Sequence, residues 1–512
     1  MKLLKALFSR VTFMVLMVLL QGAILFAVYR WFGEHAAWLE GILRLFAVLV
    51  VLGLVKNSVH LSQDVIWIIV ILLFPVPGTV LYLLLGANIL TSPTMWRILG
   101  STAGAAKYYR QDPEILKEAE ESMPDVRGQF RYLSSHAGFP LYRNTGFDYY
   151  GLGDTGYPVL LEELRKAERF IFLEYFIVEE GVMWDGILDI LREKAEAGLD
   201  VRVMYDDFGS FTTLSARYAK KLEAMGIRCV PFNRVNPVLS IILNHRDHRK
   251  ITVIDGRVAF SGGINLADEY INRKKRDGHW KDNIIRVTGE AVWSYTVLFL
   301  THWNALTRGA KDEDFTVFRA KSESRTEGET GAADGFICPY GETPLSKEIT
   351  AQNVYMNILN QANDYCWIFS PYLIIDTELI NALTLAAGRG VDVRIVMPGI
   401  PDKKLVWKVT RSYYGPLIDG GVKIYEYEPG FVHSKVFVAD DRCAAVGTVN
   451  LDYRSLYLHF ENGTYLAGSE KVLDVRRDFE ETFASCRVIK RQDKACRTGL
   501  VTSFLRLFAP LM

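Results

Sequence analysis

Two long uncharged stretches mark the first hundred residues of the chain. Val11 to Tyr29 is 19 residues long and Val65 to Leu85 is 21, and neither contains a charge. As helices rising 1.5 Å per residue, both are long enough to cross a hydrocarbon core of ~30 Å. The apolar segment from Leu39 to Val55 contains two charges near one end. We therefore predict that residues 1–100 anchor the protein in the cell (cytoplasmic) membrane as a multi-pass region, with segments at about 11–29, 39–55 and 65–86.

Basic residues flank this region on both sides, and the positive-inside rule would place both flanks in the cytoplasm. Three complete spans would instead put them on opposite sides of the membrane. Pro75 and Pro77 lie inside the last segment and would kink or break a helix there. Two spans, or three segments of which one is re-entrant, both fit the pattern. The number of spans and the membrane side of the site stay open.

From about residue 125 the pattern changes to short apolar runs, typical of buried strands, that alternate with amphipathic segments. The strand–helix–strand order occurs twice, over Phe170–Ile177, Trp184–Ala197 and Val201–Tyr205, and again over Tyr365–Ile375, Glu378–Ala387 and Val391–Val396. Strands joined through helices form βαβ units. We therefore predict an α/β fold made of two similar halves, each with a central sheet covered by helices.

A polar stretch separates the two halves. Lys321 to Gly335 is poor in apolar residues and predicts a linker between a first half at 125–320 and a second half at 336–490. The chain ends with Gly499 to Met512, which carries the single charge of Arg506. Residues 495–512 are therefore predicted either as an interfacial helix that docks the body against lipid or as a packing tail.

The overall charge narrows the range of partners. The chain has 59 basic and 59 acidic side chains, so its formal net charge is zero, which argues against a broad nucleic-acid surface. Its six cysteines are scattered without a C-x-x-C pair, which argues against a structural zinc site or a disulfide scaffold. We expect reduced, mostly buried thiols.

One pattern of chemically active residues occurs once in each half. His248 is followed by Lys at +2, Asp at +7, Gly at +14 and Asn at +17, and His433 is followed by the same residues at the same distances. All five positions therefore repeat with an offset of 185 residues. Any one of these residues alone is better explained as ordinary surface or turn chemistry. Five in one register, twice, indicate a functional site made by both halves.

The spacing indicates phosphoryl chemistry. His248 and Lys250 share one face of a strand, while Ile251 and Val253 point to the core. Lysine offers a fixed positive charge to a phosphate, and asparagine amides and backbone N–H groups at the glycine turns add neutral donors. Two imidazoles on opposite sides of one phosphorus can divide the work, one attacking and the other protonating the leaving alkoxide. We predict that no metal or cofactor is needed.

These segments resemble the two H-x-K-x(4)-D motifs of the phospholipase D superfamily. Four segments are similar to bacterial cardiolipin synthases in particular: Asn244–Gly256, Phe260–Tyr270, Pro429–Lys435 and, within the predicted membrane region, Ile66–Pro75. The resemblance covers nearly the whole chain. It implies phospholipase-D-like halves with mixed sheets packed about a pseudo-twofold axis. It also implies phosphatidyl transfer from one phosphatidylglycerol to a second through a phosphatidyl-histidine, which yields cardiolipin and glycerol.

The resemblance assigns a role to each motif residue. We assign His248 as nucleophile and His433 as general acid and base, and the symmetry of the motifs leaves the reverse order open. The predicted catalytic residues are His248, Lys250, Asp255, His433, Lys435 and Asp440. The residues predicted to bind phosphate or support the motifs are Asn265, Asn450, Gly263 and Thr448. Within the first set, Asp255 and Asp440 are expected to stabilise turns away from the phosphorus.

An acidic side chain is expected to orient each histidine by accepting its other N–H. Family placement, some 25 to 35 residues past each histidine, gives Glu461 for His433 and Asp282 for His248, with Asp277 as the second choice for His248. The superfamily often has serine in the G-S-x-N block. Here Thr448 keeps a hydroxyl and Gly263 does not, so hydroxyl help on the first side is doubtful.

Three other functions compete with cardiolipin synthesis. A phospholipase D that hydrolyses or exchanges head groups would use the same motifs, although membrane anchoring favours a second lipid over water as acceptor. A nuclease of the superfamily is disfavoured by the neutral charge. A non-enzymatic membrane protein is disfavoured because both motifs are intact. The expected partners are membrane phospholipids and not nucleic acid, while the oligomeric state, acyl-chain preference and alternative head groups stay open.

Overall fold

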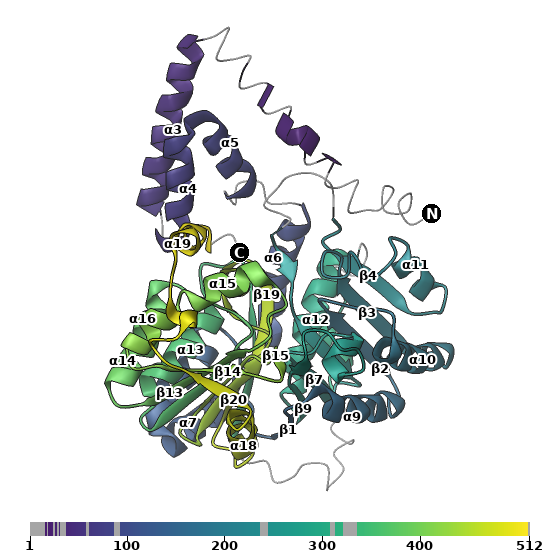
Figure 1. Ribbon diagram of the computed structural model, residues 1–512. Helices are drawn as coiled ribbons and strands as arrows, with labels where there is room; N and C mark the ends of the chain where they lie inside the picture. The colour runs from purple at the N-terminus through teal and green to yellow at the C-terminus, as the bar shows by residue number, and fades with distance from the viewer. Residues whose placement is uncertain are drawn as a thin grey trace.

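The computed structural model describes residues 37–57, 61–86, 93–235, 244–307, 313–320 and 335–509, with short stretches between residues 16 and 30. Most of the predicted segment Val11–Tyr29, and nearly all of the predicted linker Lys321–Gly335, lie outside the described residues. The described body contains two large sheets, one from each half of the chain, with helices around them (Figure 1).

The first sheet has seven strands in the order β1-β9-β7-β6-β2-β3-β4. The strands β2, β3 and β4 are parallel, and the other neighbours in this sheet are antiparallel, so the sheet is mixed. In chain order the strands are β1 (Thr145–Tyr150), β2 (Phe170–Tyr175), β3 (Asp200–Asp206), β4 (Arg228–Phe232), β6 (Lys250–Ile254), β7 (Val258–Gly262) and β9 (Ile284–Gly289).

The second sheet repeats this order as β10-β19-β17-β16-β11-β13-β14 and adds β20 at its edge. The repeated order confirms the prediction of two similar α/β halves. Its strands are β10 (Phe336–Glu342), β11 (Tyr365–Phe369), β13 (Asp392–Pro398), β14 (Lys423–Tyr427), β16 (Val436–Ala439), β17 (Cys443–Gly447), β19 (His459–Ala467) and β20 (Cys486–Ile489). The strand predicted over Tyr365–Ile375 is in fact two, because the hydroxyl of Ser370 binds the backbone at Tyr372 and Leu451 and the chain leaves the sheet there to form β12 (Leu373–Ile374).

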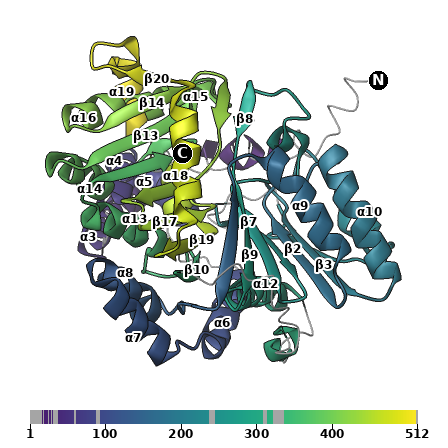
Figure 2. The ribbon, with the colours of Figure 1, turned by 90° about the horizontal axis from the view of Figure 1, so that it is seen from below.

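Helices cover both outer faces of the pair of sheets and also lie between them (Figure 2). On the first half, α9 (Gly153–Arg165) and α10 (Val182–Glu196) pack on the outer face, and α13 (Thr350–Gln361) and α14 (Thr377–Gly388) do so on the second. One core cluster contains residues of both sheets together with α12 (Val292–Leu306) and α18 (Val472–Phe483). The two halves therefore share a buried apolar centre, which fixes them as one body.

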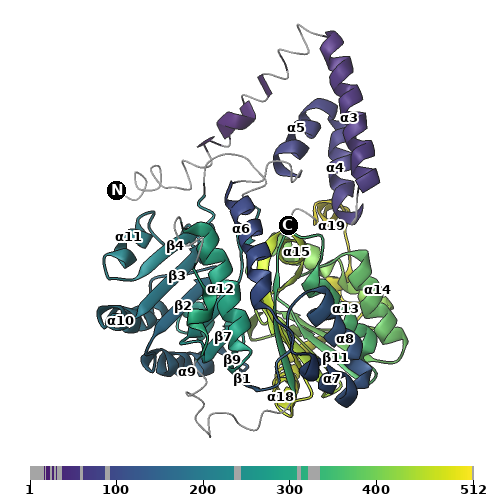
Figure 3. The same cartoon turned by 180° about the vertical axis from the view of Figure 1, so that it is seen from behind.

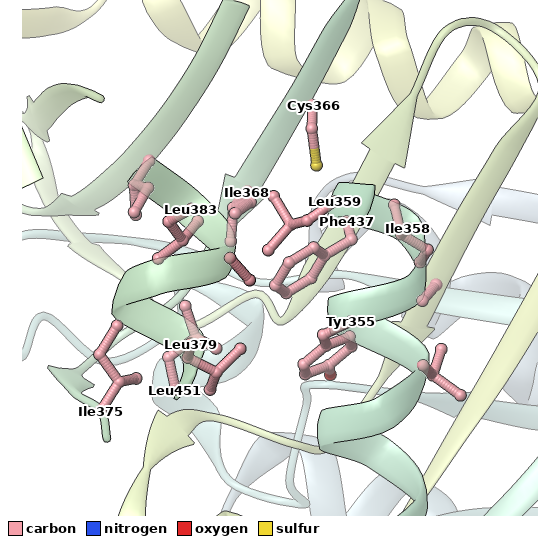
Figure 4. Packing of buried hydrophobic residues seen from close by; sticks show 14 of the residues in the cluster. Tyr355, Ile358, Leu359, Cys366, Ile368, Ile375, Leu379, Leu383, Phe437 and Leu451 are labelled. Carbon is pink, nitrogen blue, oxygen red and sulfur yellow. The ribbon is translucent and has the colours of Figure 1, made fainter. Parts of the chain in front are cut away.

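The outer core of the second half shows how the packing works (Figure 4). Tyr355 of α13 stacks on Phe437 of β16, with ring centroids 4.0 Å apart, and Leu379 and Leu383 of α14 are almost completely buried. Burying a side chain of this size contributes about 1.5–3 kcal/mol. All six cysteines are free thiols, and all but Cys486 are buried, which confirms the prediction of reduced, mostly buried thiols.

Near the N-terminus, the described helices α3 (Ala37–Asn57), α4 (Leu61–Leu73) and α5 (Pro75–Leu85) stand apart from the body (Figure 1). The chain breaks between α4 and α5 at Phe74, as the prolines at 75 and 77 predict. Ala47, Leu54 and Ile71 form a small core between these helices. Within the described part of the chain, no helix combines the length and apolar character that crossing a membrane requires.

The remaining helices close the two ends of the body. The helix α6 (Pro93–Ala105) packs along α12, as seen from behind (Figure 3). It is followed by α7 (Pro113–Ser122) and α8 (Arg127–Arg131), and the short helices α11, α15, α16 and α17 span Tyr218–Glu223, Lys404–Arg411, Tyr414–Asp419 and Tyr453–Tyr457. The last helix, α19 (Leu500–Leu507), packs against α15 and leaves Leu500 and Val501 exposed.

Candidate active site

Two short strand pairs cross between the halves and carry both histidine motifs. The strand β5 (Arg246–Asp247) of the first half pairs with β19 of the second. In return, β15 (Gly430–Val432) of the second half pairs with β8 (His279–Lys281) of the first. Each motif histidine directly follows its crossing strand and donates its backbone N–H across the interface, His248 to Phe460 and His433 to Lys281, both at 2.8 Å. The site is therefore built at the interface, with pseudo-twofold symmetry.

Each histidine side chain also meets a carboxylate from the opposite half. Nδ1 of His248 lies 2.8 and 2.9 Å from the two carboxylate oxygens of Glu461, and Nδ1 of His433 lies 2.6 Å from Oδ2 of Asp282. Both predicted acids contact a motif histidine, but the predicted pairing is wrong: Glu461 contacts His248 and Asp282 contacts His433. The reason is the exchange of strands, because β19 and β8 carry each acid across to the partner motif.

The block that follows each motif supports these carboxylates in different ways. Hydroxyls of Thr448 and Ser455 donate to Glu461, so the threonine of the second motif serves the histidine of the first. On the other side, a Cβ at Gly263 would overlap the Oδ1 atom of Asp282. Glycine at 263 therefore makes room for Asp282, which explains why no hydroxyl residue stands there.

The two motif lysines occupy equivalent buried positions. Lys250 donates to the backbone carbonyl of His248 at 2.6 Å, and Lys435 donates to that of His433. Each is 1% exposed. Burial lowers the pKa of Lys250 to about 7 and that of Lys435 to about 8, against the attraction of Glu461 and Asp282. Ammonium groups held in this way gain most from an anion that enters the site.

Burial also sets the protonation state of the imidazoles. It lowers the pKa of His433 to about 4, with Lys435 acting in the same direction and Asp282 opposing. The pKa of His248 is lowered as well, first by burial and then by Lys250. Burial raises the pKa of Glu461, while Lys250 and the two hydroxyl donors lower it. Both histidines are therefore neutral near pH 7, which is the form that can attack an electrophile.

The two motif aspartates close the turns after their strands. Asp255 has a φ of 55° and accepts backbone N–H groups from Glu168, Arg169 and Phe170 at 2.8 to 2.9 Å. Asp440 has a φ of 53° and accepts the equivalent three N–H groups at residues 363–365. The stabilising, non-contacting role expected for both from the sequence agrees with this geometry.

The two motif asparagines are held by neighbouring groups. The amide of Asn265 accepts the N–H of Ile177 at 3.1 Å and donates to the hydroxyl of Tyr270 at 2.7 Å. The ring of Tyr270 in turn packs edge-on against His433. Asn450 donates its backbone N–H to Ser455, and its buried Oδ1 atom has no hydrogen-bond partner among the described residues. Asn265 is thereby placed to position Tyr270 beside the second motif.

Several residues near the histidines were not predicted. His459, two residues before Glu461, lies on the same side of β19 and packs against His248 with ring centroids 5.6 Å apart. Phe176 packs edge-on against His248, and Trp280 packs against His433. The alternation of side chains along a strand was the signal for His459, once Glu461 had been chosen.

A second acidic cluster lies just behind the first motif. His302 of α12 places Nδ1 2.9 Å from Glu174 and 3.6 Å from Asp247, and all three side chains are buried. Arg249 supplies the positive charge, with a guanidinium nitrogen 3.7 Å from Glu174. Within the trio Glu174, Asp247 and His302, and within the trio His248, His459 and Glu461, one nitrogen or oxygen atom of each side chain lies within 4.8 Å of those of the other two. Asp247 and Arg249, which flank His248 in sequence, therefore both contact His302 of α12.

Comparison with known proteins agrees with this geometry. The family described as "Cardiolipin synthase, PLD-like domain" matches residues 160–296 and 355–483, one stretch in each half. A cardiolipin synthase of Geobacillus kaustophilus is 33% identical over 93% of this chain and 95% of its own length. An uncharacterized protein of Streptococcus mutans is 44% identical over 90% of this chain and 99% of its own.

The fold is similar to that of a solved enzyme. The crystal structure of phosphatidylserine synthase from Haemophilus influenzae superimposes with a TM-score of 0.57 at 16% identity, covering 74% of this chain and 97% of that one. Both matched stretches contain a histidine motif at the crossing-strand interface, and the similarity to a cardiolipin synthase extends over nearly the full length. The chain therefore belongs to the family of phospholipase-D-like cardiolipin synthases.

Proposed function

We propose that this protein is a membrane phosphatidyltransferase that converts two phosphatidylglycerol molecules into cardiolipin and glycerol. The observation that carries the proposal is the pair of histidine–carboxylate contacts, each made between the two halves around one site with two buried lysines. Each carboxylate accepts Nδ1–H, which leaves Nε2 of each ring available for phosphorus or for a proton. Family membership supports the choice of phospholipid substrates.

The first step breaks the bond between phosphorus and the glycerol head group. One imidazole attacks phosphorus through Nε2, the P–O bond to glycerol breaks, and the other imidazole, protonated, gives its proton to the departing alkoxide. A phosphatidyl-histidine and free glycerol result. Lys250 and Lys435 stabilise the negative charge on the phosphoryl oxygens. The phosphodiester's own charge raises the pKa of the imidazole that must carry the proton.

The second step transfers the phosphatidyl group to a lipid alcohol. The hydroxyl of a second phosphatidylglycerol gives its proton to the imidazole that is now neutral, its oxygen bonds to phosphorus, and the P–N bond breaks. Cardiolipin leaves, and the site regains its starting protonation. No redox chemistry enters either step, and the proton taken up in the second step replaces the one given in the first.

Exposed apolar helices near both ends of the chain support an active site that lies beside lipid. The helices α3 and α4 expose large apolar side chains, among them Leu45, Leu52 and Leu72. At the other end of the chain, α19 exposes Leu500 and Phe504. We propose that these surfaces and the segment Val11–Tyr29 hold the enzyme at the cell membrane, where acceptor lipid is concentrated in the same plane as the donor.

One assay tests the proposal. Purified full-length protein in mixed micelles receives phosphatidylglycerol labelled in an acyl chain and, separately, in the head group. Labelled cardiolipin with free glycerol in equal amounts is the expected result, and His248→Ala and His433→Ala should abolish it. Accumulation of phosphatidic acid alone would identify a hydrolytic phospholipase D instead, and full turnover by either variant would overturn the site.

A further inference from the structure

The two crossing strand pairs differ in chemistry even though they are related by the pseudo-twofold axis. Beside His248, the paired residues of β5 and β19 are Arg246 and His459. Beside His433, the equivalent pair on β15 and β8 is Phe431 and Trp280, whose ring centroids lie 4.9 Å apart. One side of the site is therefore cationic and the other aromatic. A substrate with a polar and an apolar end meets two different surfaces.

A third basic group completes the cationic side. Nε of Arg454, on α17, lies 3.4 Å from Nε2 of His459 and donates to it. The ring of His459 contacts that of His248, with centroids 5.6 Å apart, so the group adjoins the reacting histidine. Arg454 is partly exposed and His459 is 9% exposed, which leaves both at the border of the site rather than deep in the core.

The acids near these charges are already bonded to other groups. Glu461 lies 3.8 Å from Nδ1 of His459 but binds His248, Thr448 and Ser455. Asp452, which attracts Arg454, accepts the backbone N–H of Ser455. Asp206 lies 3.5 Å from Arg246, but its carboxylate also accepts three backbone N–H groups, and burial raises its pKa to about 6. Asp452 and Asp206 attract Arg454, but no ion pair joins it to a described residue. The buried Nδ1 atom of His459 likewise has no hydrogen-bond partner among them. Burial, Arg454 and Arg246 all lower the pKa of His459.

We propose that Arg454, His459 and Arg246 form an anion subsite that binds the phosphodiester of the acceptor phospholipid. The inference rests on the proposed function and adds the location of the second substrate. In phosphatidylglycerol the reacting hydroxyl and the phosphodiester are joined by a three-carbon chain, so a phosphate beside His459 places the hydroxyl beside His248. Arginine is well suited to this role because its planar guanidinium matches phosphate geometry.

The subsite also assigns the two histidines. An acceptor hydroxyl that arrives beside His248 gives its proton to that imidazole, and its oxygen attacks phosphorus opposite the bond to His433, which breaks. His433 therefore carries the phosphatidyl group and His248 the proton. This order is the reverse of the one we assigned from the sequence.

The experiment compares acceptors that share one covalent intermediate. Acyl-labelled phosphatidylglycerol serves as donor, and transfer is measured to a second phosphatidylglycerol, to free glycerol and to water. For Arg454→Gln we expect cardiolipin formation to fall about tenfold or more through a higher KM for the lipid acceptor. Glycerol exchange and hydrolysis, whose acceptors carry no phosphate, should stay within about twofold of the parent. Arg454→Lys, which keeps the charge, should recover part of the loss.

Arg276 provides the matched control. It lies on the aromatic side, next to Trp280, and forms an ion pair with Glu269 at 3.1 Å. Arg276→Gln should leave all three transfers unchanged. If Arg454→Gln lowers all three equally, or none, the subsite is overturned while the parent enzyme still makes cardiolipin. If the parent transfers to no acceptor at all, the proposed function itself fails, and the two results cannot be confused.

Discussion

Glu461 and His248 lie 213 positions apart in the chain, yet a carboxylate oxygen of one sits 2.8 Å from Nδ1 of the other. Asp282 and His433, which are 151 positions apart, make the equivalent contact on the other side of the pseudo-twofold axis. Each half thus supplies the carboxylate that fixes the tautomer and orientation of the other half's imidazole. The geometry that the chemistry needs exists only when the two halves are docked.

The first prediction concerns these carboxylates. Glu461→Gln and Asp282→Asn keep the size of each side chain but remove the negative charge that stabilises an imidazolium. Each should lower kcat by roughly 10²–10⁴-fold with little change in the melting temperature. Initial rates of cardiolipin formation and thermal unfolding measure the two effects. A variant that unfolds early would show that the carboxylate acts on stability instead.

The second prediction separates the two G-x-x-N blocks. Thr448→Ser keeps the hydroxyl that donates to Glu461 and should stay active, whereas Thr448→Val removes it and should lose about tenfold. Gly263→Ala introduces a Cβ into the position of the Asp282 carboxylate and should be more damaging than either. Rates for the three purified variants give the ranking. Near-normal activity for Gly263→Ala would contradict the close packing of Gly263 against Asp282.

The third prediction is a pH profile. Protonation of the nucleophile removes activity in acid, and the pKa of His433 is lowered to about 4. Activity is lost in alkali when His248 loses the proton that it gives to the leaving group and when the ammonium charge is lost. Burial lowers the pKa of His248 and brings that of Lys250 to about 7. The kcat/KM for a short-chain substrate should therefore rise from pH about 4, fall as His248 loses its proton, and fall further above pH about 7 to 8, where Lys250 and Lys435 lose theirs. Lys250→Arg, which holds its charge, should shift the alkaline limit of kcat/KM upward.

The fourth prediction concerns stability. Asp255 and Asp440 each accept three backbone N–H groups and do not contact the imidazoles. Asp255→Ala and Asp440→Ala should each lower the free energy of unfolding by about 2–4 kcal/mol. Denaturant titration measures that loss. Folded enzyme at low temperature should keep most of its kcat, and a specific loss of kcat without loss of stability would assign these residues to the chemistry.

The fifth prediction identifies the nucleophile. A phosphatidyl ester of p-nitrophenol needs no proton on its leaving group, so it reacts without the acid. His248→Ala should therefore still release a burst of p-nitrophenol and hold a phosphatidyl group on His433, detectable by peptide mass. His433→Ala should show no burst. The opposite pattern would restore the order assigned from the sequence.

The sequence was enough to predict the paired halves and the motif residues, because strand periodicity and the spacing inside each motif are local features, and the second copy of the motif shows that they recur. The partner of each histidine was not predictable in this way. Glu461 follows His433 closely in the chain, and only the crossing of β5 onto β19 brings it to His248 instead. Contacts of this kind depend on how the two sheets dock, which no local pattern encodes.

The asymmetry beside the histidines was missed for a different reason. His459 and Trp280 occupy equivalent places, but they have different chemistry, and neither belongs to the repeated motif. A search for what the halves have in common discards such positions. The repeated residues supply the shared reaction, whereas the residues that differ are placed to distinguish its two substrates.

The exchange of strands between the halves has a consequence for how such a chain can evolve. Neither half holds a complete set of reactive groups. One half could therefore accumulate substitutions independently of the other only if the enzyme lost its activity. Substitutions near either crossing strand must remain compatible with contact residues that lie more than a hundred positions away in the chain. Selection on this enzyme therefore acts on the interface between the two halves, and the two repeats are expected to evolve together.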